Sequence, residues 1–215
     1  MKRRETNEVQ IKICGITNLA DARACVDLGA DMIGLNFYSR SPRCIQPERA
    51  RRIVESIPRR VRAIGIFVDP TAGEIRSVAK TAGIKRVQLH GELSPEMCRD
   101  LAVEFRVIRA FSTGDKFHPE DVGAFSDCDV LLDAPHAELR GGTGLTSDWS
   151  AARATLPFAR FLMLSGGLNV QNVGDAIAAV APDAVDVCSG VESAPGVKDH
   201  RAIEKFIAAA GTVQQ

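Results

Sequence analysis

Four side chains with acid–base or charge-pairing chemistry lie at or just after short apolar runs of the sequence. They are the thiol of Cys14, the guanidinium of Arg43, the imidazole of His90 and the carboxyl group of Asp133. Thiols, imidazoles and carboxyl groups are common general acids and bases. Arginine can hold a carboxylate through two parallel hydrogen bonds. If the fold gathers these groups, the set predicts proton transfer on an anionic substrate.

Two glycine turns near the C-terminal end of the chain suggest a phosphate site. Ser165-Gly166-Gly167 and Ser189-Gly190 each follow an apolar run, and the first precedes a segment with helical spacing. Glycine lets backbone N–H groups approach an anion closely, and a helix N-terminus adds partial positive charge. Ordinary turn chemistry also requires glycine wherever φ is positive. Two such turns at successive runs favour phosphate binding over that simpler interpretation.

The elements that would position these residues alternate regularly along the chain. Near-continuous apolar runs are typical of parallel strands buried on both faces. We predict strands at Val9–Cys14, Met32–Phe37, Ala63–Val68, Arg86–His90, Val107–Phe111, Val130–Ala134, Phe161–Ser165 and Val185–Ser189. We predict helices at Leu19–Leu28, Arg49–Ser56, Ala72–Ala82, Pro95–Glu104, Pro119–Phe125, Ser150–Thr155, Val170–Val180 and Arg201–Ala210.

Eight strand–helix pairs imply right-handed parallel crossovers, which fit a closed barrel or a doubly wound open sheet. The count of eight favours an α/β protein of one domain, a (β/α)8 TIM barrel over residues 10–215. Residues 1–9 are expected to be a flexible N-terminal extension. In such a barrel the carboxyl ends of the strands form one rim, so the residues named above would converge there.

The bulk composition narrows the class of protein. The 215 residues include 27 Lys plus Arg and 27 Asp plus Glu, so the formal net charge is zero and we expect no nucleic-acid partner. No apolar run approaches the roughly 20 residues of a membrane span, and the charged start from Met1 to Glu8 lacks the apolar centre of a signal peptide. We therefore expect a cytoplasmic protein with no membrane partner. The six cysteines are scattered without a C-x-x-C pair, which predicts no metal site.

Seven motifs in order make the sequence recognisable. They are Lys12-Ile13-Cys14-Gly15-Ile16-Thr17, Ser41-Pro42-Arg43, Gln88-Leu89-His90-Gly91, Leu131-Leu132-Asp133-Ala134, Gly141-Gly142-Thr143-Gly144, Leu164-Ser165-Gly166-Gly167-Leu168 and Ser189-Gly190-Val191-Glu192. With these motifs the chain resembles the phosphoribosylanthranilate isomerase family from about Gln10 to the last helix. The resemblance implies a (β/α)8 barrel and a cofactor-free Amadori rearrangement of a small phosphorylated substrate in tryptophan biosynthesis.

The resemblance also implies roles for individual residues. Cys14 matches the family's general base, Asp133 its general acid, and Arg43 the arginine that holds the anthranilate carboxylate. The family's phosphate-binding loops fall on Ser165, Gly166, Gly167, Ser189 and Gly190. His90 either lines the substrate site or only ends its strand.

The proposed chemistry places demands on both proton-transfer groups. Cys14 must act as a thiolate, although a free thiol has a pKa of about 8.5. Lys12 is a possible helper if it shares a strand face with Cys14. Asp133 must be protonated, although a free Asp has a pKa of about 3.9, so burial or a nearby anion has to raise that pKa. Asp69 is expected to cap the helix that follows it or to lie just behind the site.

A few positions depart from the family pattern, and other interpretations stay open. Cys44, Leu145, Ser147 and Cys188 replace residues that are more usual there, which leaves loop packing and substrate affinity in question. Another phosphate-binding barrel, such as a sugar-phosphate epimerase, is the nearest alternative. A non-catalytic phosphometabolite sensor and a structural partner of neighbouring enzymes are the others. We expect a monomer or a weak homodimer.

Overall fold

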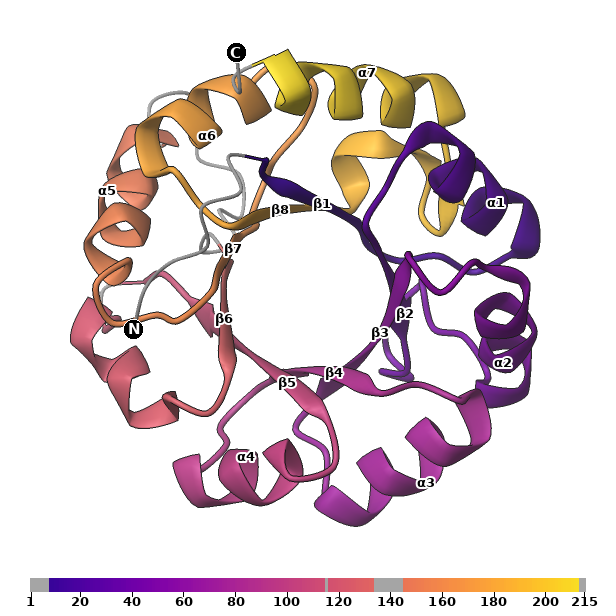
Figure 1. Cartoon of the computed structure of the whole chain (residues 1–215), viewed down its shortest axis with the longest axis horizontal. Coiled ribbons are helices and arrows are strands. Elements are labelled where there is room, and N and C mark those ends of the chain that lie inside the picture. Colours follow the sequence, from indigo (N-terminus) through magenta and orange to yellow (C-terminus); the bar gives the residue numbers. More distant parts are fainter. Residues whose placement is uncertain (1–7, 115, 134–144, 213–215) are drawn as a thin grey trace.

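The computed structural model describes residues 8–114, 116–133 and 145–212. Eight parallel strands form a closed barrel in chain order, each paired with its sequence neighbours, and β1 pairs with β8 to close the ring (Figure 1). The strands are β1 (Gln10–Ile13), β2 (Met32–Asn36), β3 (Arg62–Val68), β4 (Arg86–His90), β5 (Arg106–Ser112), β6 (Asp129–Asp133), β7 (Leu162–Leu164) and β8 (Ala184–Val187). The barrel prediction is confirmed, and the doubly wound sheet is excluded.

Helices surround the barrel as an outer ring (Figure 1). They are α1 (Leu19–Leu28), α2 (Pro47–Ser56), α3 (Ala72–Ala82), α4 (Pro95–Ala102), α5 (Leu145–Thr155), α6 (Val173–Val180) and α7 (His200–Gly211), with 3₁₀ turns η1 (Pro119–Phe125) and η2 (Ser189–Val191). Capping residues in the local sequence determine where several of these helices begin and end. Asn18 caps α1 by accepting a hydrogen bond from the Asp21 N–H, and Gly29 ends that helix in the left-handed conformation.

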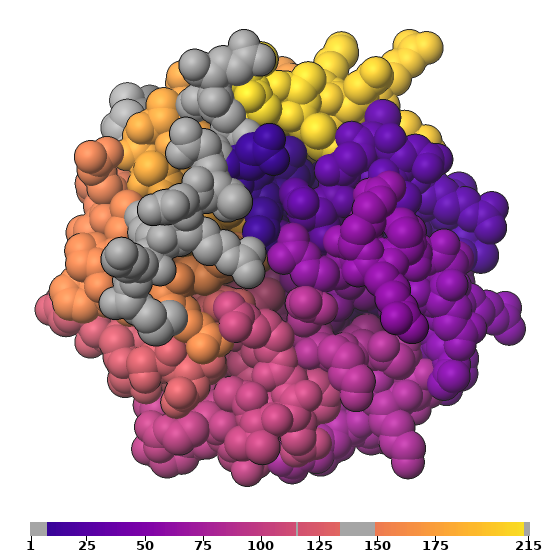
Figure 2. Space-filling model, in the orientation of Figure 1, coloured from indigo at the N-terminus to yellow at the C-terminus, as the bar shows by residue number. Residues whose placement is uncertain are grey.

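Two apolar layers result from the alternation of side chains along the strands. One set of buried residues fills the inside of the barrel, namely Met32, Ile64, Ile108, Ala110, Leu131, Met163 and Ala184. Their neighbours on the same strands face the helices and form the larger core. The ring of ribbons looks open in Figure 1, but the space-filling view from the same side shows side chains filling its centre (Figure 2). The barrel is therefore a packed core, and its chemistry has to lie at an end.

Four local predictions were wrong. The helix predicted over Ser150–Thr155 begins five residues earlier, at Leu145. Pro119–Phe125 is a 3₁₀ turn and not an α-helix. The helix predicted from Val170 begins at Val173, because residues 169–172 form a turn held by the Asn169 and Asn172 side chains. Asp69 does not cap α3.

Thr71 is the α3 cap, in a reciprocal capping box with Glu74. Asp69 has a positive φ of 47° and accepts a hydrogen bond from the Glu92 N–H. It thus links the loops after β3 and β4.

A short hairpin after β8 was not predicted. Strand β9 (Glu192–Ala194) pairs antiparallel with β10 (Val197–Lys198). Both strands are too short for a hydrophobic period to be visible in the sequence. The hairpin lies beside the loop after β1, where the Thr17 hydroxyl donates to the Gly196 carbonyl at 2.7 Å.

Candidate active site

Cys14 lies at the carboxyl end of β1, one residue beyond the last registered pair of β1 and β8, Ile13 and Val187. Its N–H donates to the Val187 carbonyl at 2.8 Å, so the backbone of Cys14 is still fixed by the barrel. The neighbouring strand makes room for the sulfur, since a Cβ at Gly34 would lie 2.8 Å from Cys14 Sγ. The half-buried thiol therefore occupies a fitted position at the rim.

A buried ion pair lies directly beneath that thiol. Lys12 Nζ is 3.0 Å from Asp186 Oδ1, and the two side chains are 0% and 5% exposed. Ser165, directly after β7, also donates to the Asp186 carboxylate, at 3.3 Å. Burial tends to lower the pKa of Lys12, but Asp186 and Cys14 outweigh it and the net shift is upward. Lys12 therefore stays positively charged near Cys14. This fits the suggestion from the sequence that Lys12 helps Cys14 to act as a thiolate.

The surroundings of Cys14 favour its thiolate form. A hydrogen bond from Cys188 is the largest cause, burial opposes it, and the positive charge of Lys12 assists it. Together they lower the pKa of Cys14 to about 7. The pKa of Cys188 is raised for the complementary reason, because it serves as the donor and lies beside the negative charge of Cys14. A general base of this kind is partly ionised at neutral pH, where it can accept a proton.

Asp133 ends β6, with β7 and β8 between it and Cys14 in the barrel. Its backbone carbonyl accepts a hydrogen bond from the Thr113 N–H at 2.9 Å, which fixes this end of the strand against β5. His90 ends β4, and its Nε2 is 2.7 Å from the side-chain nitrogen of the buried Gln88. Thus the thiol, the carboxyl group and the imidazole all lie at strand ends on the same rim.

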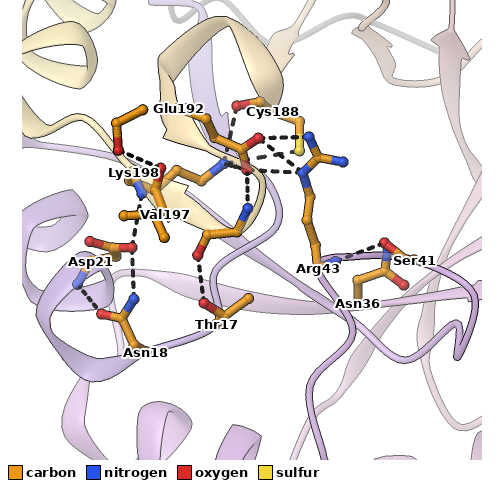
Figure 3. Close-up of polar contacts among 12 residues, drawn as sticks. Thr17, Asn18, Asp21, Asn36, Ser41, Arg43, Cys188, Glu192, Val197 and Lys198 are labelled. Carbon is orange, nitrogen blue, oxygen red and sulfur yellow. Dashed lines mark hydrogen bonds and ion pairs between the residues drawn. The ribbon is translucent and has the colours of Figure 1, made fainter.

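Arg43 lies in the loop between β2 and α2, and its side chain extends to the carboxylate of Glu192, the first residue of β9 (Figure 3). Its Nε lies 2.9 Å from Glu192 Oε1, and its Nη2 lies 2.6 Å from Glu192 Oε2. Lys198 approaches the same carboxylate at 2.9 Å and also donates to the Cys188 carbonyl at 3.1 Å. Burial alone would raise the pKa of Glu192, but its bonds to Arg43 and Lys198 lower it. Glu192 therefore holds the guanidinium in one orientation.

The glycine turns after β7 and β8 lie against each other. Gly166 and Gly167 have φ values of 88° and 67°, which the left-handed region allows glycine without strain. A Cβ at Gly190, in η2, would lie only 2.2 Å from the Leu168 carbonyl oxygen. Because α6 begins later than predicted, Gly167 is not adjacent to its N-terminus. An anion placed at these turns would therefore meet the N–H groups of the turns themselves and not the first turn of α6.

No group of three or more His, Cys, Asp or Glu side chains among the described residues is arranged to hold a metal ion. Within the same residues, no helix has the length and apolar character needed to cross a membrane.

Comparison with known proteins identifies the family. The family model described as N-(5'phosphoribosyl)anthranilate (PRA) isomerase matches residues 11–209. The enzyme of that name from Thermotoga maritima is 45% identical over 199 residues, which cover 93% of this chain and 97% of that protein. The chain belongs to the phosphoribosylanthranilate isomerase family.

Solved structures of phosphoribosylanthranilate isomerases share the fold as well as the sequence. The Thermotoga maritima enzyme has a TM-score of 0.88 with 45% identity, over 95% of this chain and 99% of that one. A second phosphoribosylanthranilate isomerase structure is a complex with reduced 1-(o-carboxyphenylamino)-1-deoxyribulose 5-phosphate, at a TM-score of 0.85 and 42% identity over 95% and 99% of the two chains. The (β/α)8 barrel and the isomerase class of this chain follow from these matches.

The predicted site residues of this isomerase do not all form direct contacts. Ser165 bonds to the ion pair beneath Cys14, whereas Arg43 is paired with Glu192. The four-residue motif at 141–144 lies outside the described residues.

Sequence analysis missed Asp186 and Lys198. A charged residue inside an apolar strand, as in Val185-Asp186-Val187, was a usable signal for the first, because an unpaired charge is too costly to bury. Lys198 gave no comparable signal, since it lies in a hairpin that only tertiary contacts define.

Proposed function

We propose that this isomerase converts N-(5'-phosphoribosyl)anthranilate to the 1-(2-carboxyphenylamino)-1-deoxyribulose 5-phosphate, with Cys14 as general base and Asp133 as general acid. The family match supplies the reaction class. The observation that carries the residue assignment is the fitted position of Cys14 above Lys12 and beside Cys188, where its pKa falls to about 7. No other described thiol combines a lowered pKa with a half-buried position at the rim.

Two proton movements account for the rearrangement. The Asp133 carboxyl group gives a proton to the ribose ring oxygen, the furanose ring opens, and a protonated Schiff base results. The Cys14 thiolate then removes the proton from the sugar carbon beside the imine. The resulting enolamine tautomerises to the ketone. The atoms of the substrate are conserved, so the steps are proton transfers and no group or electron leaves the molecule.

Arg43 is proposed to hold the anthranilate carboxylate with the part of its guanidinium that Glu192 does not use. Glu192 takes Nε and Nη2, while Nη1 has no hydrogen-bond partner among the described residues. A second carboxylate can therefore approach along the Nη1 edge without displacing the first. Glu192 carries one negative charge but pairs with both Arg43 and Lys198. The guanidinium of Arg43 is therefore not fully neutralised and can attract a second anion.

The turns at Gly166–Gly167 and Ser189–Gly190 are proposed to hold the substrate phosphate. Gly190→Ala would place a methyl group 2.2 Å from the Leu168 carbonyl, so the two turns would have to separate. We expect KM to rise about tenfold or more, while kcat falls less, because displaced N–H groups weaken binding in the ground state and the transition state alike. Initial rates over a range of substrate concentrations measure this effect.

Gly123→Ala is the matched control for that experiment. Gly123 lies in η1, where an added Cβ meets nothing within 4 Å. Its KM should equal that of the wild type. An unchanged KM in Gly190→Ala, with the variant folded, would contradict phosphate binding at these turns.

The pH dependence of kcat/KM tests how Cys14 is ionised. A general base works deprotonated, so activity should be lost as pH falls through the pKa of Cys14, at about 7. Cys188→Ala removes the hydrogen bond that contributes most to lowering that pKa, so the acid limb should move to higher pH. Cys188→Ser keeps a donor at this position and should leave the limb close to its wild-type place. Identical acid limbs in all three proteins would refute the role of Cys188 in lowering the pKa of Cys14.

A direct assay separates the enzyme from the sensor interpretation. Phosphoribosylanthranilate, generated in place, is followed by its anthranilate fluorescence. Enzymatic loss of the signal supports the proposal, whereas binding without turnover would favour a sensor.

A small phosphorylated substrate is the proposed partner, with no nucleic-acid or membrane partner and a cytoplasmic location. The Thermotoga maritima relative is described as dimeric, with monomers also crystallised. For this chain we keep the prediction of a monomer or weak homodimer.

A further inference from the structure

Cys14 and Cys188 bring two thiols together at the rim of the barrel. Each residue follows the registered pair Ile13 and Val187 on adjacent parallel strands, and the two side chains are hydrogen-bonded to one another. Adjacent strands lie about 4.8 Å apart, which is inside the range of about 4.4–6.8 Å between the Cα atoms of a disulfide. The backbone is thus already spaced for a bond between the two sulfur atoms.

Glycines on either side keep space for both sulfur atoms. A Cβ at Gly34 would lie 2.8 Å from Cys14 Sγ, and a Cβ at Gly15 would lie 3.0 Å from Cys188 Sγ. Gly15 also has a φ of 76°, which bends the chain directly after Cys14. With no side chains at these two positions, the sulfur atoms are free of the crowding that would keep them apart.

The other cysteines provide an internal comparison. Cys98 in α4 and Cys128 just before β6 are also hydrogen-bonded to each other, but they are only 0% and 2% exposed. Cys25 is fully buried, and burial raises its pKa to about 12, so it stays a thiol. Cys14 and Cys188 are the described hydrogen-bonded thiol pair that is half-exposed at the rim. Of the two thiol pairs, this one is therefore the more accessible to an oxidant from solvent.

We propose that Cys14 and Cys188 form a reversible disulfide when the protein meets a hydroperoxide, and that this bond blocks the isomerase site. The Cys14 sulfur attacks one oxygen of hydrogen peroxide, an S–O bond forms, the O–O bond breaks, and water leaves. Cys188 then attacks the sulfenic sulfur of Cys14, an S–S bond forms, the S–O bond breaks, and a second water leaves. The two thiols lose two electrons and two protons, which reduce one peroxide to two waters.

Oxidation of Cys14 also makes Cys188 a better nucleophile. In the reduced protein the Cys14 hydrogen bond, burial and the Cys14 charge together raise the pKa of Cys188. A sulfenic acid at position 14 carries no such charge. Lys198 Nζ, 4.0 Å from Cys188 Sγ, remains to stabilise the attacking thiolate. The second step is therefore favoured once the first has taken place.

The test is oxidation of the intact chain by hydrogen peroxide, followed by peptide mapping without reduction. The wild type should yield a peptide that joins Cys14 to Cys188 and has lost two hydrogen atoms, and dithiothreitol should restore both the free thiols and the starting activity. In Cys188→Ser, Cys14 should advance to sulfinic and sulfonic acids, and dithiothreitol should restore little of that variant's own starting activity. Cys128→Ser is the matched control, because it breaks the buried pair and should respond as the wild type does.

Either of two results would overturn the proposal. One is a wild type whose Cys14 reaches sulfinic acid without the cross-linked peptide. The other is a Cys188→Ser protein that dithiothreitol reactivates as completely as the wild type. The peptide map does not depend on activity, so a cross-linked protein with full activity would confirm the disulfide, refute its proposed blocking of the site, and refute the base role of Cys14.

Discussion

Replacing Cys14 with alanine is expected to lower kcat by about 10²–10⁴-fold while the barrel stays folded, because a positioned general base contributes that much to rate. The loss corresponds to about 3–5.5 kcal/mol of transition-state stabilisation. The lost stabilisation should lower kcat more than it changes KM, since the proton is taken only in the transition state. Single-turnover decay of the anthranilate fluorescence measures it, with circular dichroism to confirm folding.

Cys25→Ala is the matched control for the Cys14 variant. Cys25 is a fully buried cysteine of α1, whose pKa is raised to about 12, so it packs as a small apolar side chain. Its replacement should change stability and leave kcat near the wild-type value. Iodoacetamide should also alkylate Cys14 much faster than Cys25. A Cys14→Ala protein that retains wild-type turnover would refute the assignment of the base.

Replacing Asp133 with asparagine is expected to reduce kcat by a similar factor of about 10²–10⁴. The amide has nearly the same size as the carboxyl group but cannot give a proton to the ribose ring oxygen. The backbone at Asp133 is fixed by the Thr113 N–H and should not move. Because ring opening precedes the Cys14 step, the variant should bind substrate and leave it unconverted. Single-turnover mixing with equilibrium binding distinguishes this from lost affinity.

The same strand offers a control of the same residue type. Asp129 begins β6 at the opposite end of the barrel, where it pairs with Arg106 at 2.6 Å and with Arg160 at 3.2 Å. Asp129→Asn should lower the melting temperature without affecting kcat, because the amino ends of barrel strands serve stability. If Asp129→Asn lost turnover and Asp133→Asn kept it, the acid assignment would be wrong.

The barrel was predictable from the sequence because its signals are local. Strands buried on both faces leave continuous apolar runs, and eight such runs alternating with helical spacing admit few topologies. The helices Leu19–Leu28 and Ala72–Ala82 have the bounds that their caps indicated. The segment Pro119–Phe125 was harder to assign, since one short turn carries too little periodicity to separate a 3₁₀ turn from an α-helix.

The sequence by itself determined the residue types at the strand ends, and through the order of the strands it determined that Cys14, His90 and Asp133 share one rim. The tertiary structure decided how those groups are tuned. The Lys12–Asp186 pair and the Cys14–Cys188 contact both join residues 174 positions apart in the chain. They exist because closing the barrel brings β8 beside β1. A pKa depends on such neighbours and on burial, and neither is visible in a linear pattern.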